Sequence, residues 1–365
     1  MAQLRPDHDA RRILVVGAGG VVGRAVVERC ERLGIDGLGV GRSGGPQDGF
    51  PHLALDLEDE AACRQILAHA GAFTHVVFCA WRAGPDREAE VAPNLAMLKN
   101  VLDALRETSP GLRHLTLLQG VKAYGSHLGP FRQPACETDP RHAGPNFYYA
   151  QEDHVRARAA AEGWSWTILR PVTVCGMSRR SAMSMVSVLA VLASLARARG
   201  EPLRFPGTEI AFRAERQMVD ADLLARAILW SGENQGAMGE IFNVTNGDVV
   251  TWAGLWPGIA ALFDVAADAP AQAELAAAMP LLKPLWTELA GDHELAEESF
   301  FDNVPWRYAD GLFSRRYGNC LDTAKLRGAG FHETLDTPAM FERQFLRLAE
   351  ERLIPPLGAA APLHA

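Results

Sequence analysis

This sequence of 365 residues lacks the features of several large protein classes. It has no cluster of basic residues, and its 44 Asp and Glu outnumber its 36 Lys and Arg, which gives a net charge of -8. Phosphate contacts need clustered cationic side chains, so nucleic acid is not an expected partner. The longest apolar run, 182–196, contains three serines and is too short to cross a bilayer. The N-terminus has no apolar signal core, so we expect a cytoplasmic protein without membrane contact.

The cysteines also exclude a class of structure. The six of them are scattered, form no C-x-x-C pair and do not stand at metal-ligand spacing from histidines. We therefore expect free thiols and no metal site. Hydrophobic residues make up 48% of the chain and charged residues 22%, so a large core is expected in one or two domains. Either a monomer or a homodimer is compatible with this composition.

Short apolar runs alternate with stretches of helical periodicity through the first half of the chain. The predicted strands are 12–16, 37–41, 74–80, 112–118 and 164–169, and the predicted helices are 20–33, 59–70, 93–107 and 147–162. This alternation predicts an α/β fold, a doubly wound parallel sheet of the Rossmann type. After Pro171 the alternation weakens, and the stretch 251–355 is mostly helical.

A glycine-rich turn joins the first predicted strand to the first predicted helix. Gly17, Gly20 and Gly23 fit G-x-x-G-x-x-G, and Gly19 allows the spacing G-x-G-x-x-x-G as well. Such glycines let the backbone turn sharply, bring a dinucleotide pyrophosphate close and let the helix pack on the strand. The amides at the start of the helix would then face the phosphates. A glycine turn without a nucleotide is the alternative.

The residues after the second predicted strand bear on the choice of nucleotide. An NAD enzyme usually places Asp or Glu there, whereas this chain has Gly41-Arg42-Ser43. An arginine with a small hydroxyl neighbour suits a 2′-phosphate, so the predicted cofactor is NADPH. A solvated surface arginine is the alternative. Asp56 could reach the adenine amino group, or it could cap the following helix.

The polar residues best placed for chemistry follow the fourth predicted strand and open the next helix. The strand leads into LLQGVKAY (117–124), and the helix opens with NFYYAQED (146–153). Short-chain dehydrogenases normally carry Tyr-x-x-x-Lys on this helix, but Glu152 and Asp153 stand four residues after Tyr148 and Tyr149. Lys122, at the end of the strand, is the candidate to replace the missing lysine.

Together these segments resemble the progesterone 5β-reductase and iridoid synthase-like enzymes, an atypical branch of the extended short-chain dehydrogenases/reductases. LLQGVKAY is similar to the family pattern L-Q-T-G-x-K-x-Y, and residues 146–153 match N-F-Y-Y-x-x-E-D at every fixed position. The likeness spans nearly the whole chain. It implies a Rossmann fold, NADPH as cofactor, and Tyr148 and Lys122 as the catalytic pair.

The resemblance also implies reduction of an activated C=C bond, the 1,4-reduction of an enone. Negative charge would develop on the carbonyl oxygen, where a Tyr O–H beside an ammonium can stabilise it. The same pair could reduce an aldehyde or ketone directly, which is the alternative. A nucleotide-sensing protein without turnover is a further possibility, whereas a sugar-nucleotide epimerase would need the absent Tyr-x-x-x-Lys.

The chain departs from the family pattern in the residues near the substrate. Leu118-Gln119 replace Gln-Thr, and the pocket-lining loop between Lys122 and Tyr148 is shorter than in the plant enzymes, so their substrate does not carry over. We expect a small apolar enone or carbonyl compound. The predicted substrate contacts are Trp81, Tyr149, Met185, Trp306 and Phe313, with core packing as the alternative. His127 and His154 are predicted to be surface residues.

The predicted cofactor contacts come from the strand ends along one edge of the sheet. They are Gly17, Gly19, Gly20, Val21, Val22, Gly23, Arg42, Ser43, Asp56, Leu57, Ala80, Trp81, Gln119, Gly120, Pro171, Val172 and Val174. Residues 1–180, with return segments near 206–250, are predicted to form the NADP-binding domain. Residues 181–205 and 251–356 are predicted to form a smaller, mainly helical substrate-binding lid, followed by a tail at 357–365.

Overall fold

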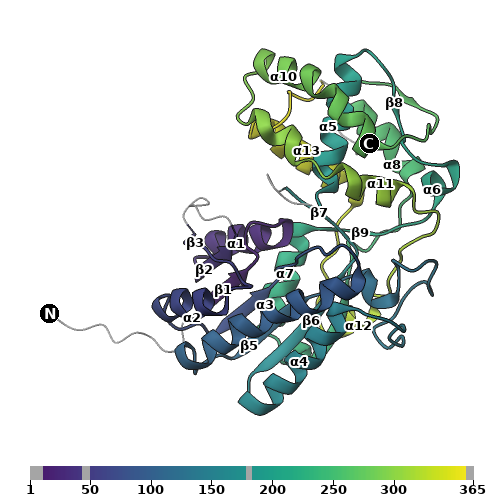
Figure 1. Cartoon of the computed structure of the whole chain (residues 1–365). Coiled ribbons are helices and arrows are strands. Elements are labelled where there is room, and N and C mark those ends of the chain that lie inside the picture. The colour runs from purple at the N-terminus through teal and green to yellow at the C-terminus, as the bar shows by residue number, and fades with distance from the viewer. Residues whose placement is uncertain (1–10, 43–49, 178–182, 359–365) are drawn as a thin grey trace.

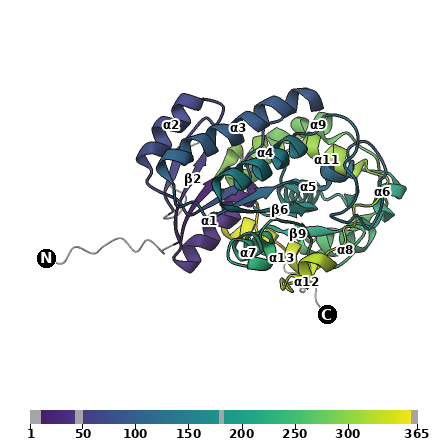
Figure 2. The same cartoon turned by 90° about the horizontal axis from the view of Figure 1, so that it is seen from below.

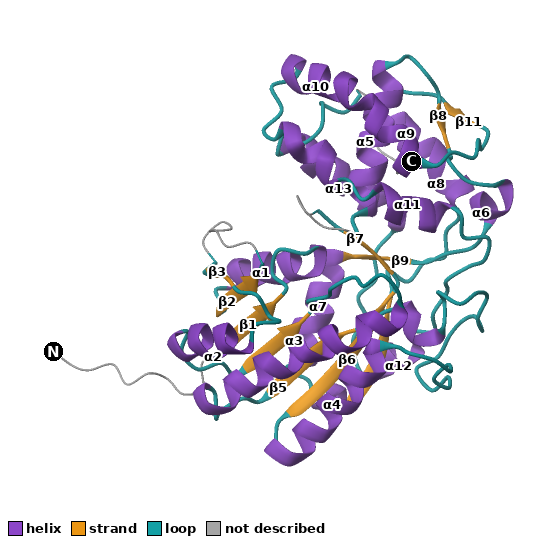
Figure 3. Cartoon of the chain, viewed as in Figure 1, coloured by secondary structure: helices purple, strands orange, loops and turns teal. Residues whose placement is uncertain are grey.

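A computed structural model describes residues 11–42, 50–177 and 183–358 of the chain. Figure 1 shows two lobes, which we call the sheet lobe and the helical lobe, and the strands β7 (Thr173–Cys175) and β9 (Met218–Asp220) lie where they meet. Figure 3 shows the large sheet, flanked by helices, in the sheet lobe, and mainly helices in the other lobe. Among the described residues, no helix has the length and apolar character needed to span a membrane.

The sheet lobe is built on seven parallel strands in the order β10-β6-β5-β4-β1-β2-β3. Their bounds are β1 (Arg12–Val16), β2 (Asp36–Gly41), β3 (His52–Ala54), β4 (His75–Phe78), β5 (His114–Leu118), β6 (Ser165–Pro171) and β10 (Glu240–Val244). Strand order reverses direction between β1 and β4, which places a ligand crevice outside the carboxyl ends of these strands. The predicted doubly wound parallel sheet is thus confirmed.

Helices cover both faces of the sheet, so its strands are buried on two sides. The helices α2 (Glu60–His69), α3 (Arg87–Thr108) and α4 (Phe147–Glu162) lie on one face, and α1 (Val21–Leu33) and α7 (Ala221–Ser231) lie on the other (Figure 2). Each face of the sheet has its own hydrophobic core, and alternate residues of β1 point into one or the other. Ile13 faces α1 and α7, whereas Leu14 faces the opposite helix layer. This alternation explains why the strand reads as a continuous apolar run.

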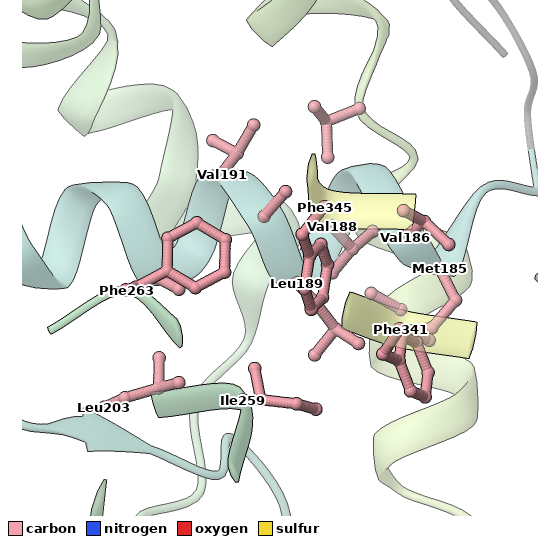
Figure 4. Close-up of a cluster of buried hydrophobic side chains, with 14 of the residues drawn as sticks. Met185, Val186, Val188, Leu189, Val191, Leu203, Ile259, Phe263, Phe341 and Phe345 are labelled. Carbon is pink, nitrogen blue, oxygen red and sulfur yellow. The ribbon is translucent and has the colours of Figure 1, made fainter. Parts of the chain in front are cut away.

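The helical lobe surrounds one almost entirely apolar helix, α5 (Met185–Ala198). Around it pack α8 (Trp252–Leu262), α10 (Lys283–Asp292), α11 (Trp306–Phe313) and α13 (Thr337–Glu350). Figure 4 shows side chains of α5 lying among Phe263, Phe341 and Phe345. The short elements are β8 (Leu203–Arg204), α6 (Glu209–Arg213), η2 (Gln235–Ala237), β11 (Ala267–Asp268), α9 (Leu275–Ala278), η3 (Met279–Leu282), η4 (Glu298–Asn303) and α12 (Ala324–Gly328).

Several boundaries differ from the predicted ones. Helix α3 begins at Arg87, not at Pro93, because Asp86 caps it by accepting a hydrogen bond from the Ala89 N–H (2.9 Å). Strand β6 continues through Pro171, because its pairing with β5 ends at Leu169 and Pro171 lies opposite Val244 of β10 alone, as in an edge strand. The edge strand β3 was not predicted as a strand.

Part of the predicted lid lies in the sheet lobe. Helix α12 packs against β10, and both Leu326 and Phe331 belong to the core that α1 and α7 share with the sheet. The Phe331 ring lies 5.5 Å from that of Trp230 on α7. The apolar residues of 321–331 therefore return to the sheet lobe, so 251–356 does not form one continuous lid.

Two histidines lie at the amino ends of neighbouring central strands, opposite the carboxyl ends of the sheet. His75 opens β4 and His114 opens β5, their rings are 6.3 Å apart, and both are buried. A ring nitrogen of His75 bonds the Gly232 carbonyl (3.2 Å). Burial lowers the pKa of His75 to about 4 and that of His114 to about 3, so both stay neutral in the folded protein at pH 7.

We expect acid to destabilise the fold through these histidines. The folded-state pKa values lie below the usual 6.5, so between pH 6.5 and about 4 the unfolded chain binds protons that the folded chain refuses. The free energy of unfolding, measured by urea denaturation, should fall over this window. His114→Asn should reduce that slope, whereas substitution of the exposed His69 should leave it unchanged. Equal slopes in both variants would contradict this account.

Candidate active site

The glycine turn has a geometry that only glycine can satisfy at two positions. Gly17 has a φ of 89°, and its N–H donates to the Val40 carbonyl at 2.9 Å. A Cβ on Gly23 would lie 2.2 Å from the Gly17 carbonyl oxygen, so any side chain there would push α1 off the turn. Gly20 caps α1 without a side-chain hydrogen bond, which leaves first-turn amides available to an anion. This turn fits a pyrophosphate.

The other predicted cofactor contacts mostly follow the carboxyl ends of neighbouring strands. Ala80 and Trp81 follow β4, Gln119 and Gly120 follow β5, and Pro171, Val172 and Val174 lie at the end of β6 and in β7. The structure thus gathers them along the edge that carries the glycine turn. Arg42 is exposed just after β2, Leu57 is buried, and Ser43 lies outside the described residues.

Asp56 does not cap a helix. Its carboxylate accepts a hydrogen bond from the Glu58 N–H (3.0 Å) and is otherwise exposed. The cap of α2 is Asp59, which accepts from the Ala62 N–H (2.9 Å). The N-cap alternative for Asp56 is therefore wrong, and its adenine-binding role stays a prediction.

Two side chains of α4 hold the segment that carries Lys122. Asn146 caps α4 by accepting from the Tyr148 N–H (3.0 Å), and its Nδ2 donates to the Lys122 carbonyl (3.1 Å). The Tyr149 hydroxyl donates to the Ala123 carbonyl at 2.7 Å. We call these contacts between α4 and the 3-10 helix η1 (Val121–Tyr124) the α4–η1 clamp. The clamp fixes the backbone of the predicted lysine next to the predicted tyrosine.

The clamp places the two predicted catalytic side chains at the carboxyl edge of the sheet. The Tyr148 hydroxyl lies over Gly120, where a Cβ would be 3.3 Å away. The Lys122 ammonium lies 5.3 Å from the centre of the Trp81 ring, a cation–π arrangement. The indole N–H of Trp81 is buried and has no hydrogen-bond partner among the described residues. The tyrosine hydroxyl therefore lies beside the carboxyl end of β5, and the lysine ammonium beside the residue that follows β4 by three positions.

An ion pair on α3 shifts the pKa values of both predicted catalytic residues. Arg87 and the buried Glu90 are 3.1 Å apart. Burial raises the pKa of Tyr148, and the Glu90 carboxylate raises it further, so the hydroxyl is protonated at neutral pH. Burial lowers the pKa of Lys122, and the charge of Arg87 lowers it further. Sequence reasoning missed this pair because the predicted helix began only at Pro93.

Glu152 occupies the place of the usual helix lysine and lies in a buried network. Its carboxylate accepts from Arg170 (3.2 Å) and from Gln119 Nε2 (3.3 Å), and Gln119 Nε2 also donates to the Tyr148 carbonyl (3.0 Å). Burial alone would raise the pKa of Glu152, but neighbouring arginines, Arg170 foremost, lower it below its usual value. This network leaves no place for a lysine at position 152. It also includes Gln119, one of the residues by which this chain departs from the family pattern.

His127 lies at the site, contrary to its prediction as a surface residue. Burial and the nearby Arg87 lower its pKa to about 4, and the charge of Lys122 contributes as well. Its ring is 5.0 Å from that of His142, and its Nδ1 is buried without a partner among the described residues. No pattern in the sequence marked this histidine, because it stands in an irregular loop.

Most of the predicted substrate contacts have packing roles in the structure. Met185, Trp306 and Phe313 lie in the core of the helical lobe, because the helices α5 and α11 turn these side chains inward. The Tyr149 hydroxyl is held between the Ala123 carbonyl and the His142 N–H. These contacts fit the core-packing alternative. Of the five, Trp81 has a free polar group at the site.

The parallel sheet, the glycine turn and the tyrosine at the carboxyl edge define an extended short-chain dehydrogenase/reductase. Within that class, the chain belongs to the family of PRISE-like Rossmann-fold domains, whose sequence model matches residues 54–283. It is 32% identical to an (S)-8-oxocitronellyl enol synthase of Antirrhinum majus over 77% of this chain and 74% of the relative. It is 30% identical to a 3-oxo-Delta(4,5)-steroid 5-beta-reductase of Arabidopsis thaliana over 81% of each.

Solved structures agree with this fold. A Thermus thermophilus UDP-glucose 4-epimerase in complex with NAD matches with a TM-score of 0.65, covering 92% of this chain and 97% of the epimerase at 19% identity. At that identity the likeness describes the fold alone.

We expect that restoring a lysine on α4 would damage the protein. Glu152→Lys would place a second cation beside the buried Arg170, and the free energy of unfolding should fall by roughly 3 kcal/mol or more. Asp153→Lys is the matched control, because Asp153 is exposed and pairs with Arg141 at the surface. That variant should lose less than about 1 kcal/mol. Similar losses in urea denaturation of the two variants would refute the role assigned to Glu152.

Proposed function

We propose that this protein is an NADPH-dependent reductase that saturates the activated C=C bond of a small enone, with Tyr148 and Lys122 at the reacting centre. The observation that supports the proposal is the α4–η1 clamp, which bonds the backbone of Lys122 and Ala123 to the start of α4, the helix that carries Tyr148. The Arabidopsis relative supports it, since its name describes reduction of a 3-oxo-Delta(4,5)-steroid.

The chemistry follows from the charge that develops on the substrate. When bound, NADPH supplies a hydride. Tyr148 donates a hydrogen bond to the carbonyl oxygen, where negative charge grows as the enolate forms, and this stabilises the transition state most. Its raised pKa keeps it a donor at neutral pH. Lys122 adds positive charge beside the same oxygen and favours release of the tyrosine proton.

The preference for NADPH rests on Arg42. The side chain is exposed just after β2, one strand from the glycine turn, where it can reach a 2′-phosphate. First-turn amides of α1 would hold the pyrophosphate. No acidic residue follows β2 at the position where NAD enzymes bind the ribose hydroxyls.

Removing the Tyr148 hydroxyl should abolish most of the activity. With 2-cyclohexen-1-one and NADPH, Tyr148→Phe should lower kcat/KM by roughly 100-fold or more, because a transition-state donor is lost, while NADPH still binds. Tyr149→Phe is the comparison variant: it removes one of the two hydrogen bonds of the clamp but no donor to the substrate, so kcat/KM should fall by clearly less than in Tyr148→Phe. Full activity of Tyr148→Phe would sink the assignment. An allylic alcohol as product would replace enone reduction by carbonyl reduction.

The cofactor preference can be tested at the end of β2. Arg42→Ala should weaken NADPH binding by roughly tenfold or more and leave NADH binding nearly unchanged, since only NADPH carries the 2′-phosphate. Calorimetric titration with both nucleotides measures this. Arg64→Ala, on the exposed face of α2, serves as the control and should change neither affinity. Equal weakening of both nucleotides would remove Arg42 from the 2′-phosphate site.

A further inference from the structure

Where the two lobes meet, a buried arginine has no carboxylate partner within the described part of the chain. Arg216 is 4% exposed, and its guanidinium lies 5.5 Å from the centre of the Trp252 ring. Its Nη2 donates to the Ala211 carbonyl (2.8 Å), while its Nε is buried without a partner among the described residues. Burying an unpaired cation costs free energy, so such an arrangement calls for an anion that the folded chain itself does not supply.

A second arginine lies near the first. Arg315 is partly buried, stacks over the Tyr317 ring at 5.7 Å and pairs with no carboxylate among the described residues. Burial and, to a smaller extent, the charge of Arg315 lower the pKa of Arg216 to about 10. The backbone supports this proximity, because Arg216 forms a β-bridge with Asn319, four residues after Arg315.

The arginines that line a cavity elsewhere in the protein differ from Arg216, because each of them pairs with a carboxylate. A cavity of about 300 Å³ between α1, α7 and α13 is lined by arginines that all pair with carboxylates. They are Arg24, Arg32, Arg226, Arg343 and Arg347, which pair with Glu28, Asp222, Glu333, Asp220 and Glu351. That cavity is therefore a balanced ion-pair network. Of the two arginines that are buried among the described residues, Arg170 pairs with Glu152, whereas Arg216 has no such partner there.

The two arginines belong to the neighbourhood of the candidate active site. The charge of Arg315 lowers the pKa values of both Lys122 and His127. Burial raises the pKa of Tyr308, on α11, and the charge of Arg315 acts to lower it. The Tyr308 hydroxyl makes no hydrogen bond among the described residues. Arg216 stands two residues before β9, which pairs with β7 beside the predicted cofactor contact Val174. The Tyr317 hydroxyl, two residues after Arg315, donates to the Ser126 carbonyl (2.7 Å), so the segment that carries Arg315 lies against the loop that carries His127.

We propose that Arg216 and Arg315 form a subsite for an oxyanion, a carboxylate or a phosphate group, carried by the substrate at the end away from its reacting carbonyl. This inference rests on the proposed function and narrows its substrate class to enones with an anionic group. Guanidinium groups suit both anions because their forked N–H donors match two oxygens at once. The unpartnered Tyr308 hydroxyl can donate a further hydrogen bond.

Binding of three matched probes tests the subsite in the full-length protein. Benzoate, phenyl phosphate and neutral benzyl alcohol would be titrated calorimetrically, with and without saturating NADPH. We expect at least one anion to bind roughly tenfold or more tightly than the alcohol, since charge-assisted hydrogen bonds contribute that much. A preference for benzoate assigns a carboxylate, and a preference for phenyl phosphate assigns a phosphate. Equal binding of all three, or no binding of either anion, overturns the proposal.

Variants locate the binding to these arginines. Arg315→Gln and Arg216→Gln should each weaken binding of the preferred anion by roughly tenfold. The exposed neighbour Arg316 provides the matched control, and Arg316→Gln should leave the affinity unchanged. An affinity that survives in Arg315→Gln overturns the assignment even if Arg216→Gln fails to fold.

A stability measurement separates binding from a merely structural role. Arg216→Met should keep or raise the thermal midpoint of the ligand-free protein, because it removes an unpaired buried charge. A large fall in the midpoint would mean that Arg216 is needed for the fold and would overturn the proposal. Arginine-dependent anion binding without any enone reduction would instead keep the subsite and reject the proposed function.

Discussion

The α4–η1 clamp is the constraint on which the site depends. Asn146 serves two segments, since the same amide that caps the start of α4 also holds the Lys122 carbonyl. Tyr149 repeats the contact one residue along η1. A tyrosine and a lysine that come from different elements can then keep a fixed relation, as they would on one helix. This explains why an asparagine and a second tyrosine flank Tyr148.

Because the candidate lysine lies on η1 and not on α4, position 152 of α4 can hold a glutamate. Glu152 there neutralises Arg170, and Gln119 links that pair to the Tyr148 carbonyl. The helix, β5 and β6 are thereby tied together next to Tyr148. A buried network of this kind is stabilising only when every member has a partner, which makes the residues at 119, 152 and 170 interdependent.

The sequence predicted the sheet because its buried strands are continuous apolar runs, and it predicted Tyr148 and Lys122 because their segments match a family pattern. It failed where long-range geometry decides. Pro93 suggested a helix start, which hid Arg87 and Glu90, although Asp86 caps a longer helix. His127 stands in a loop, where no periodic pattern marks it. Apolar residues such as Met185 have the same sequence pattern whether they line a pocket or pack in a core. Unpaired arginines become visible only when their neighbours are known.

The return of 321–331 to the sheet lobe has a consequence for motion. The chain passes between the lobes before α5, before β9, after β10, and on both sides of α12, so they are joined by several crossings and not by one linker. Several connections restrict the relative motion of the lobes more than a single linker would. The entropy of bringing the lobes together is then lost at folding, so a ligand between them meets a preorganised surface and loses little further freedom on binding.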